Sequence, residues 1–296
     1  MLQLLRFLPR ALKERVIRSR MAIDDPELEG LTVQVASTVE EHEQASRLVH
    51  AAYVRRGIMQ PHTSGVRITP HGLLPSTVVF VALKQDVVIA TMSLVLDSVL
   101  GLPMDKSFAD ELAPLREAGK KIAEVGALCI AEHHRGLGVA FLLNKLMWLT
   151  ASQRLGVRSL AISVHPRAAC LYQATLRFVQ LGGTKRYPGL DAAAVALHLD
   201  LDEAEAVLAR DFGAMGLDPR SPYYLYCVRR DAQLEMPSQL LIDQQLAEVR
   251  SQTAVRLDSL RPDCLQALDN PQRRLLRGVI PVLRDQLKSR PLLIAQ

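Results

Sequence analysis

The segment from Glu132 to Ala140 is the first part of the sequence in which we expect chemistry. It reads Glu-His-His-Arg-Gly-Leu-Gly-Val-Ala and separates an apolar run that predicts a strand from a longer one that predicts a helix. Two glycines there let the backbone approach a ligand closely, and the free amides of a helix N-terminus attract phosphate. No GxGxxG or GKS/GKT motif is present, so neither a dinucleotide fingerprint nor a P-loop is indicated. A tight turn that binds nothing is the second interpretation of these glycines.

Several other residue types near this segment could do chemistry. His133 and His134 have no partner at a metal-ligand spacing, so the sequence predicts no metal site. Cys129 and Cys170 carry nucleophilic thiols, but lone cysteines usually pack as small hydrophobic residues. Arg167 begins an expected helix, where its guanidinium either clamps a substrate carboxylate or remains a surface charge.

Composition limits the classes of protein. The chain has 296 residues, 49% hydrophobic and 23% charged, which indicates one large domain or one domain with an appendage. No run of eighteen apolar residues predicts a membrane span, and the four cysteines form no metal or disulfide framework, which favours a reducing cytoplasm. Aromatic residues are only 4%, too few for base-stacking platforms, so we expect no nucleic-acid partner.

The net charge is concentrated at the N-terminus. The first twenty residues hold six bases and one acid, which accounts for the whole formal charge of +5. Apolar residues recur there at helical spacing: Leu5, Leu8, Leu12 and Val16. This pattern predicts a basic amphipathic helix within residues 1–30, and Arg6 and Arg10 interrupt it too much for a secretory signal. The helix either packs on its own domain or lies on a membrane surface or an acidic partner.

Alternating strands and helices must position the glycine segment. Between residues 31 and 201 we expect strands at 31–36, 77–83, 87–95, 121–131, 159–164 and 193–199, and helices at 38–56, 105–118, 136–155 and 168–176. Thr38 and Glu41 form a capping box, and Lys84-Gln85-Asp86 joins an antiparallel hairpin. The pattern predicts an α/β domain with a mixed sheet. Residues 202–296 show helical spacing without a catalytic cluster, which predicts a structural or partner-docking helical extension whose last helix begins at Asn270-Pro271.

The order of these elements resembles the GNAT acyltransferases. Strand, glycine loop, long helix, strand and short helix with a tyrosine follow one another there, and residues 135–140 resemble the acyl-donor phosphate loop of that superfamily. Further motifs are similar to the FeeM-like branch, the long-chain N-acyl amino acid synthases related to acyl-homoserine lactone synthases: Gly101-Leu-Pro-Met-Asp105, Glu111–Arg116, Ala123–Leu128, His165-Pro-Arg167, Leu171-Tyr172 and Tyr187-Pro-Gly189. The resemblance covers roughly residues 35–201. It implies a mixed, mostly antiparallel sheet flanked by helices.

The resemblance also implies an activity. Members of this branch transfer a long acyl chain from acyl carrier protein to the amine of an amino acid or similar small molecule. Acyl carrier protein or coenzyme A brings the acyl group as a cosubstrate, and no bound cofactor or metal is implied. Two alternatives stay open: a GNAT that uses acetyl-coenzyme A, and a non-catalytic protein that binds acyl thioesters. We expect a cytoplasmic protein, with peripheral membrane contact through residues 1–20 as a further expectation.

Site residues follow from the same resemblance. Glu124 stands where the superfamily often keeps a general base, although a strand-end glutamate also fits a salt bridge. Backbone amides near Leu128 and Cys129 would hold the oxyanion, and Tyr172 would protonate the leaving sulfur or else be a core tyrosine. The phosphate-binding residues would be His133, Arg135, Gly136, Leu137, Gly138, Val139 and Ala140.

Three positions depart from the family pattern. Arg177-Phe178 follows the tyrosine helix where relatives have Gly-Phe. His133 replaces a usual Gln or Arg, and Ala127 stands where relatives often have an arginine. The last difference argues against lactone-synthase chemistry.

Overall fold

The fold is taken from a computed structural model that describes residues 9–19, 23, 28–134, 137–187, 192–238, 246–261, 273, 274, 276 and 278. Within these residues eight strands are joined in the order β1-β2-β3-β4-β5-β8-β6, and β7 also pairs with β8. Every pair is antiparallel except β4 with β5. The strands are β1 (Leu31–Val35), β2 (Thr77–Lys84), β3 (Val87–Leu96), β4 (Ile122–Ile130), β5 (Ser159–Val164), β6 (Val179–Gln180), β7 (Lys185–Tyr187) and β8 (Ala192–Asp200). The sheet is therefore mixed and mostly antiparallel, as expected.

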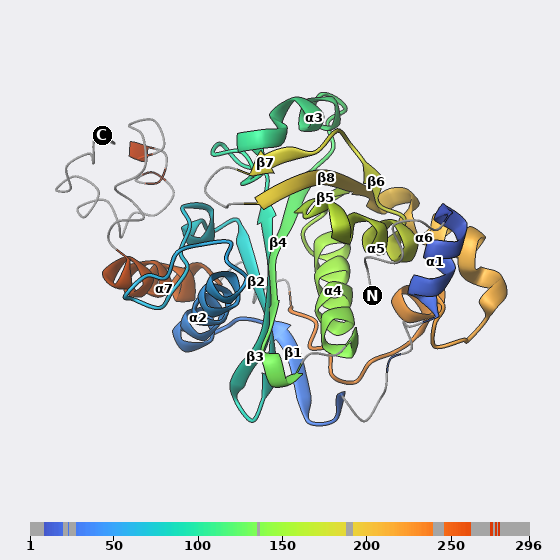
Figure 1. The fold of residues 1–296 in the computed structure, drawn as a ribbon. Helices are drawn as coiled ribbons and strands as arrows, with labels where there is room; N and C mark the ends of the chain where they lie inside the picture. Colours follow the sequence, from blue (N-terminus) through green and yellow to red (C-terminus); the bar gives the residue numbers. More distant parts are fainter. Residues whose placement is uncertain are drawn as a thin grey trace.

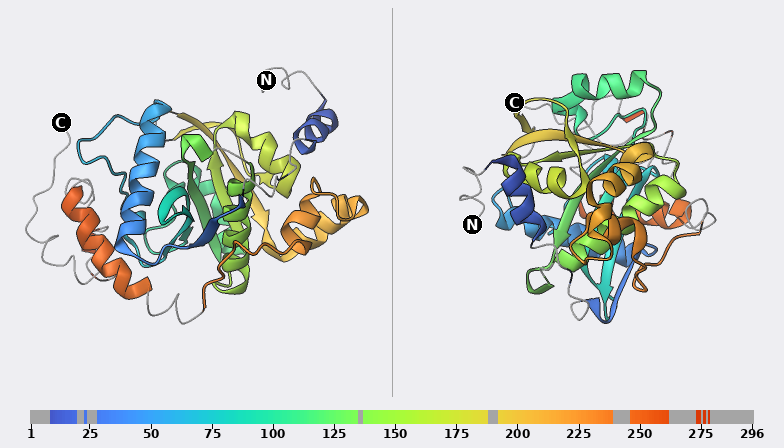
Figure 2. Two further views of the ribbon diagram at one scale, coloured as in Figure 1. Left: turned by 90° about the horizontal axis from the view of Figure 1, so that it is seen from below. Right: turned by 90° about the vertical axis from the view of Figure 1, so that its right-hand side faces the viewer.

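Helices cover both faces of the sheet. They are α1 (Arg10–Arg18), α2 (Val39–Arg55), α3 (Asp105–Glu117), α4 (Leu137–Gln153), α5 (Pro166–Leu176), α6 (Leu201–Phe212) and α7 (Leu246–Leu260), with 3-10 turns at His71–Leu73, Glu132–His134 and Gly213–Met215 and a π-helical turn at Tyr224–Val228. In Figures 1 and 2, α2 and α7 lie on one face, whereas α4 and α5 lie on the other. None of the described helices is both long and apolar enough to cross a membrane.

Local sequence signals explain most element boundaries. The Thr38 hydroxyl accepts a hydrogen bond from the Glu41 amide at 3.1 Å, and the Glu41 carboxylate accepts one from the Ser37 amide at 2.6 Å. This N-terminal cap confirms the expected start of α2. Gln85 and Asp86, both at positive φ, join the expected β2–β3 hairpin. Strands β6 and β7, with two and three residues, were not expected, because so few residues cannot show an alternating pattern.

The centre of the sheet is opened by two irregularities. Pairing between β4 and β5 ends at Val125 and Ile162, although both strands continue beyond these residues. On the other side of β4, the register with β3 shifts so that Met92 alone faces Ala127 and Leu128. Ala127 has a φ of 53°, as a residue in a β-bulge often does. The splay and the bulge place main-chain groups of β4 beside a gap in the sheet.

The described residues after 200 pack on the domain. The buried Lys145 ammonium of α4 binds the Leu225 carbonyl at 2.8 Å and the Asp231 carboxylate at 2.7 Å. Residues 233–235 exchange backbone hydrogen bonds with Val33 at the edge strand β1. The division into residues 1–30, 31–201 and 202–296 stays a prediction, and the start of the expected last helix at Asn270-Pro271 lies outside the described residues.

The N-terminal helix α1 packs against α5. The Glu14 carboxylate accepts a hydrogen bond from Arg177 at 2.7 Å, and Arg177 also binds Asp211 at 2.8 Å. The Arg18 and Arg177 guanidinium groups lie 5.3 and 4.7 Å from the ring centre of Phe212. These contacts support the packing interpretation of the basic helix, whereas membrane contact stays a prediction. Residues 1–8 and 20–22 of the expected helix lie outside the described residues.

Candidate active site

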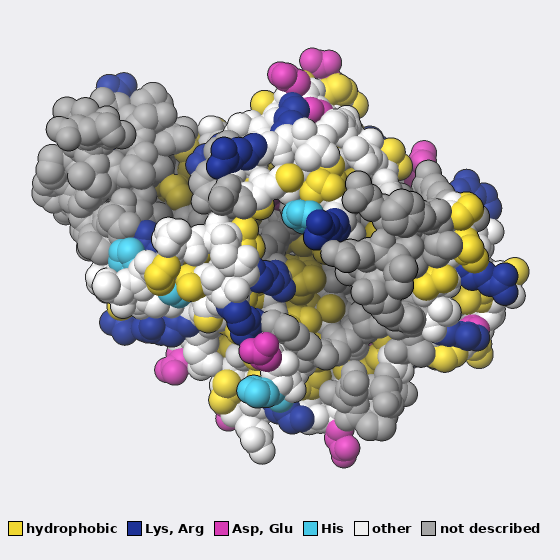
Figure 3. Space-filling view, in the orientation of Figure 1, with side chains coloured by type: hydrophobic (Ala, Val, Ile, Leu, Met, Phe, Trp, Pro, Cys, Tyr) yellow, Lys and Arg dark blue, Asp and Glu magenta, His cyan; other side chains and the backbone are white. Residues whose placement is uncertain are grey.

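A cavity of about 740 Å³ lies where β4 and β5 separate. Its walls come from the sheet and from helices on both of its faces. Tyr53 belongs to α2, Glu124 and Leu128 to β4, and Tyr172 to α5. The hollow in Figure 3 has hydrophobic side chains on its floor and Lys and Arg side chains at its rim. Cavities of roughly 300–1,000 Å³ are typical of ligand sites. The structure thus brings Glu124, Leu128 and Tyr172 to one cavity.

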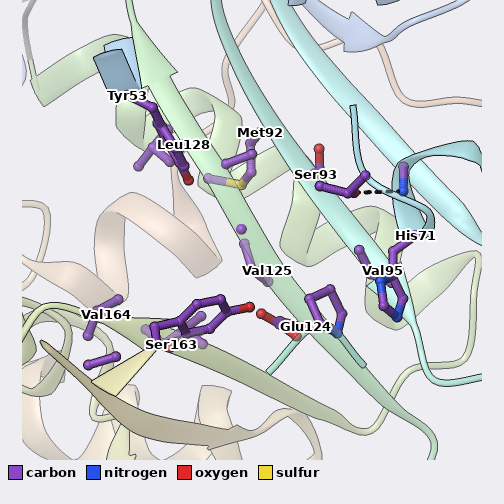
Figure 4. Close-up of a pocket in the computed structure, with 18 of the residues that line it drawn as sticks. Tyr53, His71, Met92, Ser93, Val95, Glu124, Val125, Leu128, Ser163 and Val164 are labelled. Carbon is purple, nitrogen blue, oxygen red and sulfur yellow. Dashed lines mark hydrogen bonds between the residues drawn. The ribbon is translucent and has the colours of Figure 1, made fainter. Parts of the chain in front are cut away.

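Glu124 lies in the middle of the sheet, opposite Val95 of β3 and Ala161 of β5. Its side chain points into the cavity (Figure 4) and the residue is only 5% exposed. One carboxylate oxygen, Oε2, accepts a hydrogen bond from the Met104 amide at 2.7 Å. Burial raises the pKa of Glu124 from 4.5 to about 8, and the amide hydrogen bond opposes this shift only in part. Its partner is a backbone amide, not the cation of a strand-end salt bridge, and its pKa suits proton exchange near neutral pH.

A shell of polar side chains around Glu124 was not anticipated from the sequence. The Arg67 guanidinium lies 4.9 Å from the centre of the Tyr53 ring, and Tyr187 of β7 also lines the cavity. Burial raises the pKa of Tyr53, and burial and then the Glu124 carboxylate raise that of Tyr187. Both phenols therefore stay protonated and available as hydrogen-bond donors. Arg67 attracts Glu124 and lowers its pKa slightly.

The two strand residues assigned to the oxyanion differ in their surroundings. Leu128 lies in the bulge, opposite Met92, and lines the cavity. Cys129 is paired with Thr91, and its side chain packs with Val49 and Ala52 of α2. Burial raises the pKa of the Cys129 thiol to about 11, which keeps it protonated and unsuited to nucleophilic attack. Of the two residues, Leu128 is therefore the one that borders the cavity.

Tyr172 projects from α5 into the cavity and contacts Phe178 edge-on, with ring centres 5.8 Å apart. Burial raises the pKa of Tyr172, so the phenol keeps its proton at neutral pH. The residue after α5, Arg177, has φ 60° and ψ 28°, the left-handed conformation that glycine adopts most easily. Arg177 therefore keeps the turn that a glycine would make, despite the departure from the family pattern.

The expected phosphate loop is described only in part. Arg135 and Gly136 lie outside the described residues, as does the side chain of Leu137, the first residue of α4. His133 is exposed, Val139 is buried and Ala140 is partly buried. A Cβ at Gly138 would lie 2.6 Å from a methyl carbon of Leu28, so packing alone explains that glycine. Phosphate binding stays a prediction that rests on the helix N-terminus.

The remaining candidates do not line the cavity. Arg167 is exposed and does not line it. The Cys170 thiol contacts the Arg167 carbonyl at 3.6 Å. His134 follows β4 in the short turn that ends at that residue. Within the part of the chain that the structure describes, no cluster of His, Cys, Asp and Glu side chains is arranged to hold a metal ion.

Several cavity residues had weak or no sequence signals. Arg56, the C-cap of α2, borders the cavity. It falls seven positions after Val49 and three after Tyr53, and this helical spacing could have identified it. His71, in the connection to β2, lines the cavity, and burial lowers its pKa so that it is neutral at pH 7. Arg261, directly after α7, also reaches the cavity, so the C-terminal extension contributes to the site.

Comparison with known proteins adds independent evidence. A family model described as N-acyl amino acid synthase FeeM matches residues 44–200, more than half of the chain. The structure of FeeM from uncultured soil microbes is 27% identical and covers 61% of this chain and 97% of its own, with a TM-score of 0.55. No curated protein sequence matches the chain.

Two further solved structures are less similar. The coenzyme A-dependent acyl-homoserine lactone synthase BjaI is 14% identical, covering 74% of this chain and 99% of its own, with a TM-score of 0.47. A putative N-acetyltransferase from Lactobacillus plantarum is 19% identical, covering 58% and 99%, with a TM-score of 0.42. The family match and the FeeM structure confirm the resemblance found in the motifs. The chain belongs to the N-acyl amino acid synthase FeeM family and is an N-acyltransferase with a GNAT-like fold.

Proposed function

We propose that this enzyme transfers a long acyl chain from the thioester of acyl carrier protein to the amine of an amino acid or similar small molecule. The observation that carries the proposal is the single cavity that contains a proton acceptor, a proton donor and a bulged strand. Glu124, Tyr172 and Leu128 all line it. Amide formation from a thioester is accelerated by a base for the amine, a hydrogen-bond donor for the oxyanion and, to a smaller extent, a proton donor for the sulfur.

Amide formation couples two proton transfers to formation of the C–N bond and cleavage of the C–S bond. The ionised Glu124 carboxylate accepts a proton from the amine as the nitrogen attacks the thioester carbonyl and the C–N bond forms. The Leu128 amide donates to the resulting oxyanion. When the carbonyl re-forms, the C–S bond breaks and Tyr172 gives its proton to the departing sulfur. The proton held by Glu124 returns through solvent to the tyrosine, so the enzyme ends in its starting state and releases an amide and a thiol.

The apolar part of the cavity supports an acyl chain as the donor group. Met92 of β3, Met147 and Trp148 of α4, and Leu160 and Ile162 of β5 line its walls. Burial of each methylene contributes about 0.8 kcal/mol, so such walls favour a long chain over an acetyl group. An enzyme that uses only acetyl-coenzyme A has no need of this surface.

Arg67 supports an acceptor with a carboxylate. Its guanidinium stacks on Tyr53 in the cavity and interacts electrostatically with Glu124 and Tyr187. A guanidinium binds a carboxylate with two parallel hydrogen bonds and would hold the adjacent amine toward the base. Arg67→Gln should raise KM for an amino acid more than for a primary amine of the same side chain that lacks the carboxylate. Equal effects on both acceptors would remove Arg67 from acceptor binding.

Donor choice is tested with purified enzyme. Palmitoyl acyl carrier protein and palmitoyl-coenzyme A are each incubated with pooled amino acids, and N-acyl amino acids are measured by mass spectrometry. We expect the carrier-protein donor to give the faster reaction. Strict dependence on acetyl-coenzyme A would overturn the proposal, and absence of turnover with every thioester, together with thioester binding, would favour a non-catalytic role.

We also propose that the enzyme acts in the cytoplasm and contacts the membrane surface. The cysteines in the described part of the chain, Cys129, Cys170 and Cys227, are free thiols, which supports action in the reducing cytoplasm. Arg15 on the exposed side of α1 would attract an anionic membrane surface or an acidic carrier protein. The N-acyl product would be amphiphilic. Membrane contact would allow the enzyme to release this product into the bilayer, where its acyl chain leaves water.

A further inference from the structure

Arg116 joins two carboxylates at opposite ends of one loop. Its Nε and Nη2 atoms donate to Asp97 at 2.7 and 3.1 Å, and its Nη1 and Nη2 atoms donate to Asp105 at 2.8 and 2.6 Å. Asp97 directly follows β3, whereas Asp105 begins α3. A guanidinium that binds two carboxylates bidentately uses its full fork of donors, which lysine cannot reproduce.

The shape of α3 is what permits this contact. Asp105 and Arg116 are eleven residues apart, and in a straight helix this separation is about 16 Å along the axis. The backbone of Phe108 is non-helical, with φ −128° and ψ 26°, and this kink divides α3. Arg116 in the last turn can therefore reach Asp105 in the first. The kinked helix and the loop form a closed unit tied by one side chain.

The loop inside this unit is hydrogen-bonded to Glu124. The Asp105 carboxylate also accepts a hydrogen bond from the Leu102 amide at 2.6 Å. Gly101, at φ 67°, makes room for that carboxylate, since a Cβ there would lie 2.4 Å from an Asp105 oxygen. Two residues after Leu102, the amide of the fully buried Met104 donates to Glu124 Oε2 at 2.7 Å. The position of this amide thus depends on the loop that Arg116 closes.

We propose that Arg116 is a positioning residue for Glu124: by holding Asp97 and Asp105 together, it keeps the Met104 amide on the carboxylate. The inference rests on the proposed role of Glu124 as the general base. Arg116 itself does not line the cavity and touches none of the reacting atoms. Its effect on the reaction would therefore pass entirely through the loop and Asp105.

The direction of the effect follows from the groups around Glu124. Tyr53 from α2, Arg67 from the loop that follows it, Asp105 from α3 and Tyr187 from β7 interact with it electrostatically. The Met104 amide lowers the pKa of Glu124, and the Asp105 charge raises it. Loss of Arg116 weakens the first contact and leaves Asp105 without its counter-charge. Both changes raise the pKa of Glu124, so the acid limb of kcat/KM should move to higher pH.

The test compares Arg116→Gln, Arg116→Lys and the wild type across pH, with palmitoyl acyl carrier protein and an accepted amino acid. Arg220→Gln is the control, because it removes an exposed arginine that binds Asp218 at 2.7 Å and does not line the cavity. We expect Arg116→Gln to lose about tenfold in kcat/KM at pH 7 for each pH unit that the acid limb moves. Arg116→Lys should move the limb less, and Arg220→Gln should leave it in place.

A double variant separates positioning from general loss of structure. If Arg116 acts through Glu124, Arg116→Gln should have little further effect on the activity that remains in Glu124→Gln. Equal losses in both backgrounds, or an acid limb that stays in place in Arg116→Gln, would overturn the inference. Full activity of the single variant Glu124→Gln would instead overturn the assignment of Glu124 as the base, so this outcome is distinguishable from failure of the positioning role. Thermal melting of each variant shows whether it is folded.

Discussion

Replacement of Glu124 by glutamine is the perturbation that discriminates best among accounts of this site. Glutamine has nearly the same size, and its amide oxygen can still accept the hydrogen bond that the Met104 amide donates at 2.7 Å. It cannot accept a proton at neutral pH. The change therefore removes the base and leaves the packing around it, so turnover should fall at least about tenfold.

The structure also predicts how the loss changes with pH. With a pKa of about 8, Glu124 is ionised in roughly one molecule in ten at pH 7 and nine in ten at pH 9. The acceptor amine also loses a proton over this range, but it does so with both enzymes. The ratio of wild-type to Glu124→Gln activity cancels the amine and should rise about tenfold between pH 7 and pH 9.

The assay follows release of the carrier thiol, with amide product measured in the same samples. A blank without enzyme at each pH subtracts alkaline hydrolysis of the thioester. A ratio that stays constant from pH 7 to pH 9 would refute the assignment of a titrating base with this pKa. Full activity of the variant at pH 7 would transfer the base role to water or to the neutral His71 in the cavity wall.

Stability gives a second readout of the same carboxyl group. A raised pKa means that the folded protein binds the proton more tightly than the unfolded chain, so stability is lost as pH rises from 4.5 through about 8. Glutamine carries no such penalty. The melting temperature of Glu124→Gln should exceed that of the wild type above pH 8, and the two should converge near pH 4.5. A difference that does not change with pH would contradict this assignment of the pKa.

Three further changes test other parts of the site. Tyr172→Phe should reduce turnover less than Glu124→Gln, because a thiolate leaves tolerably without a proton; a larger loss than that of Glu124→Gln would contradict this order. Arg177→Gly relieves about 1 kcal/mol of left-handed strain but removes the contacts with Glu14, Asp211 and Phe212, so thermal melting should show a net loss of stability; a higher melting temperature would show that the strain outweighs the contacts. Removal of residues 1–20 should lower the melting temperature, since α1 packs on α5; an unchanged value with loss of salt-sensitive liposome flotation would favour membrane docking instead.

Elements of the fold that depend on interactions between neighbouring residues were predicted from the sequence, whereas those that depend on distant residues were not. The Thr38–Glu41 cap and the turn at Gln85 and Asp86 are local, so the sequence predicted α2 and the β2–β3 hairpin close to their observed bounds. Strands β6 and β7 carry too few residues for any periodicity, and pairing with the long strand β8 is what holds them.

The site was harder to predict because many of its contacts are distant in sequence. Glu124, Leu128 and Tyr172 were identified from the family resemblance and line one cavity. Arg67 and His71 come from a connection without apolar periodicity, so nothing in the sequence placed them beside Glu124. At Gly138 the sequence predicted a phosphate-binding glycine. The structure shows that a glycine is also required there by packing, because a Cβ would collide with Leu28.

The central claim is that this acyltransferase makes N-acyl amino acids with Glu124 as the base. Mass spectrometry of lipid extracts from cells that express the wild type or Glu124→Gln tests this claim most directly. We predict a new long-chain N-acylated amino acid in the wild-type extract, and at least about tenfold less of it with the variant at equal protein level. Extracts that contain only N-acetylated products, or equal amounts of long-chain product from both proteins, would contradict the account.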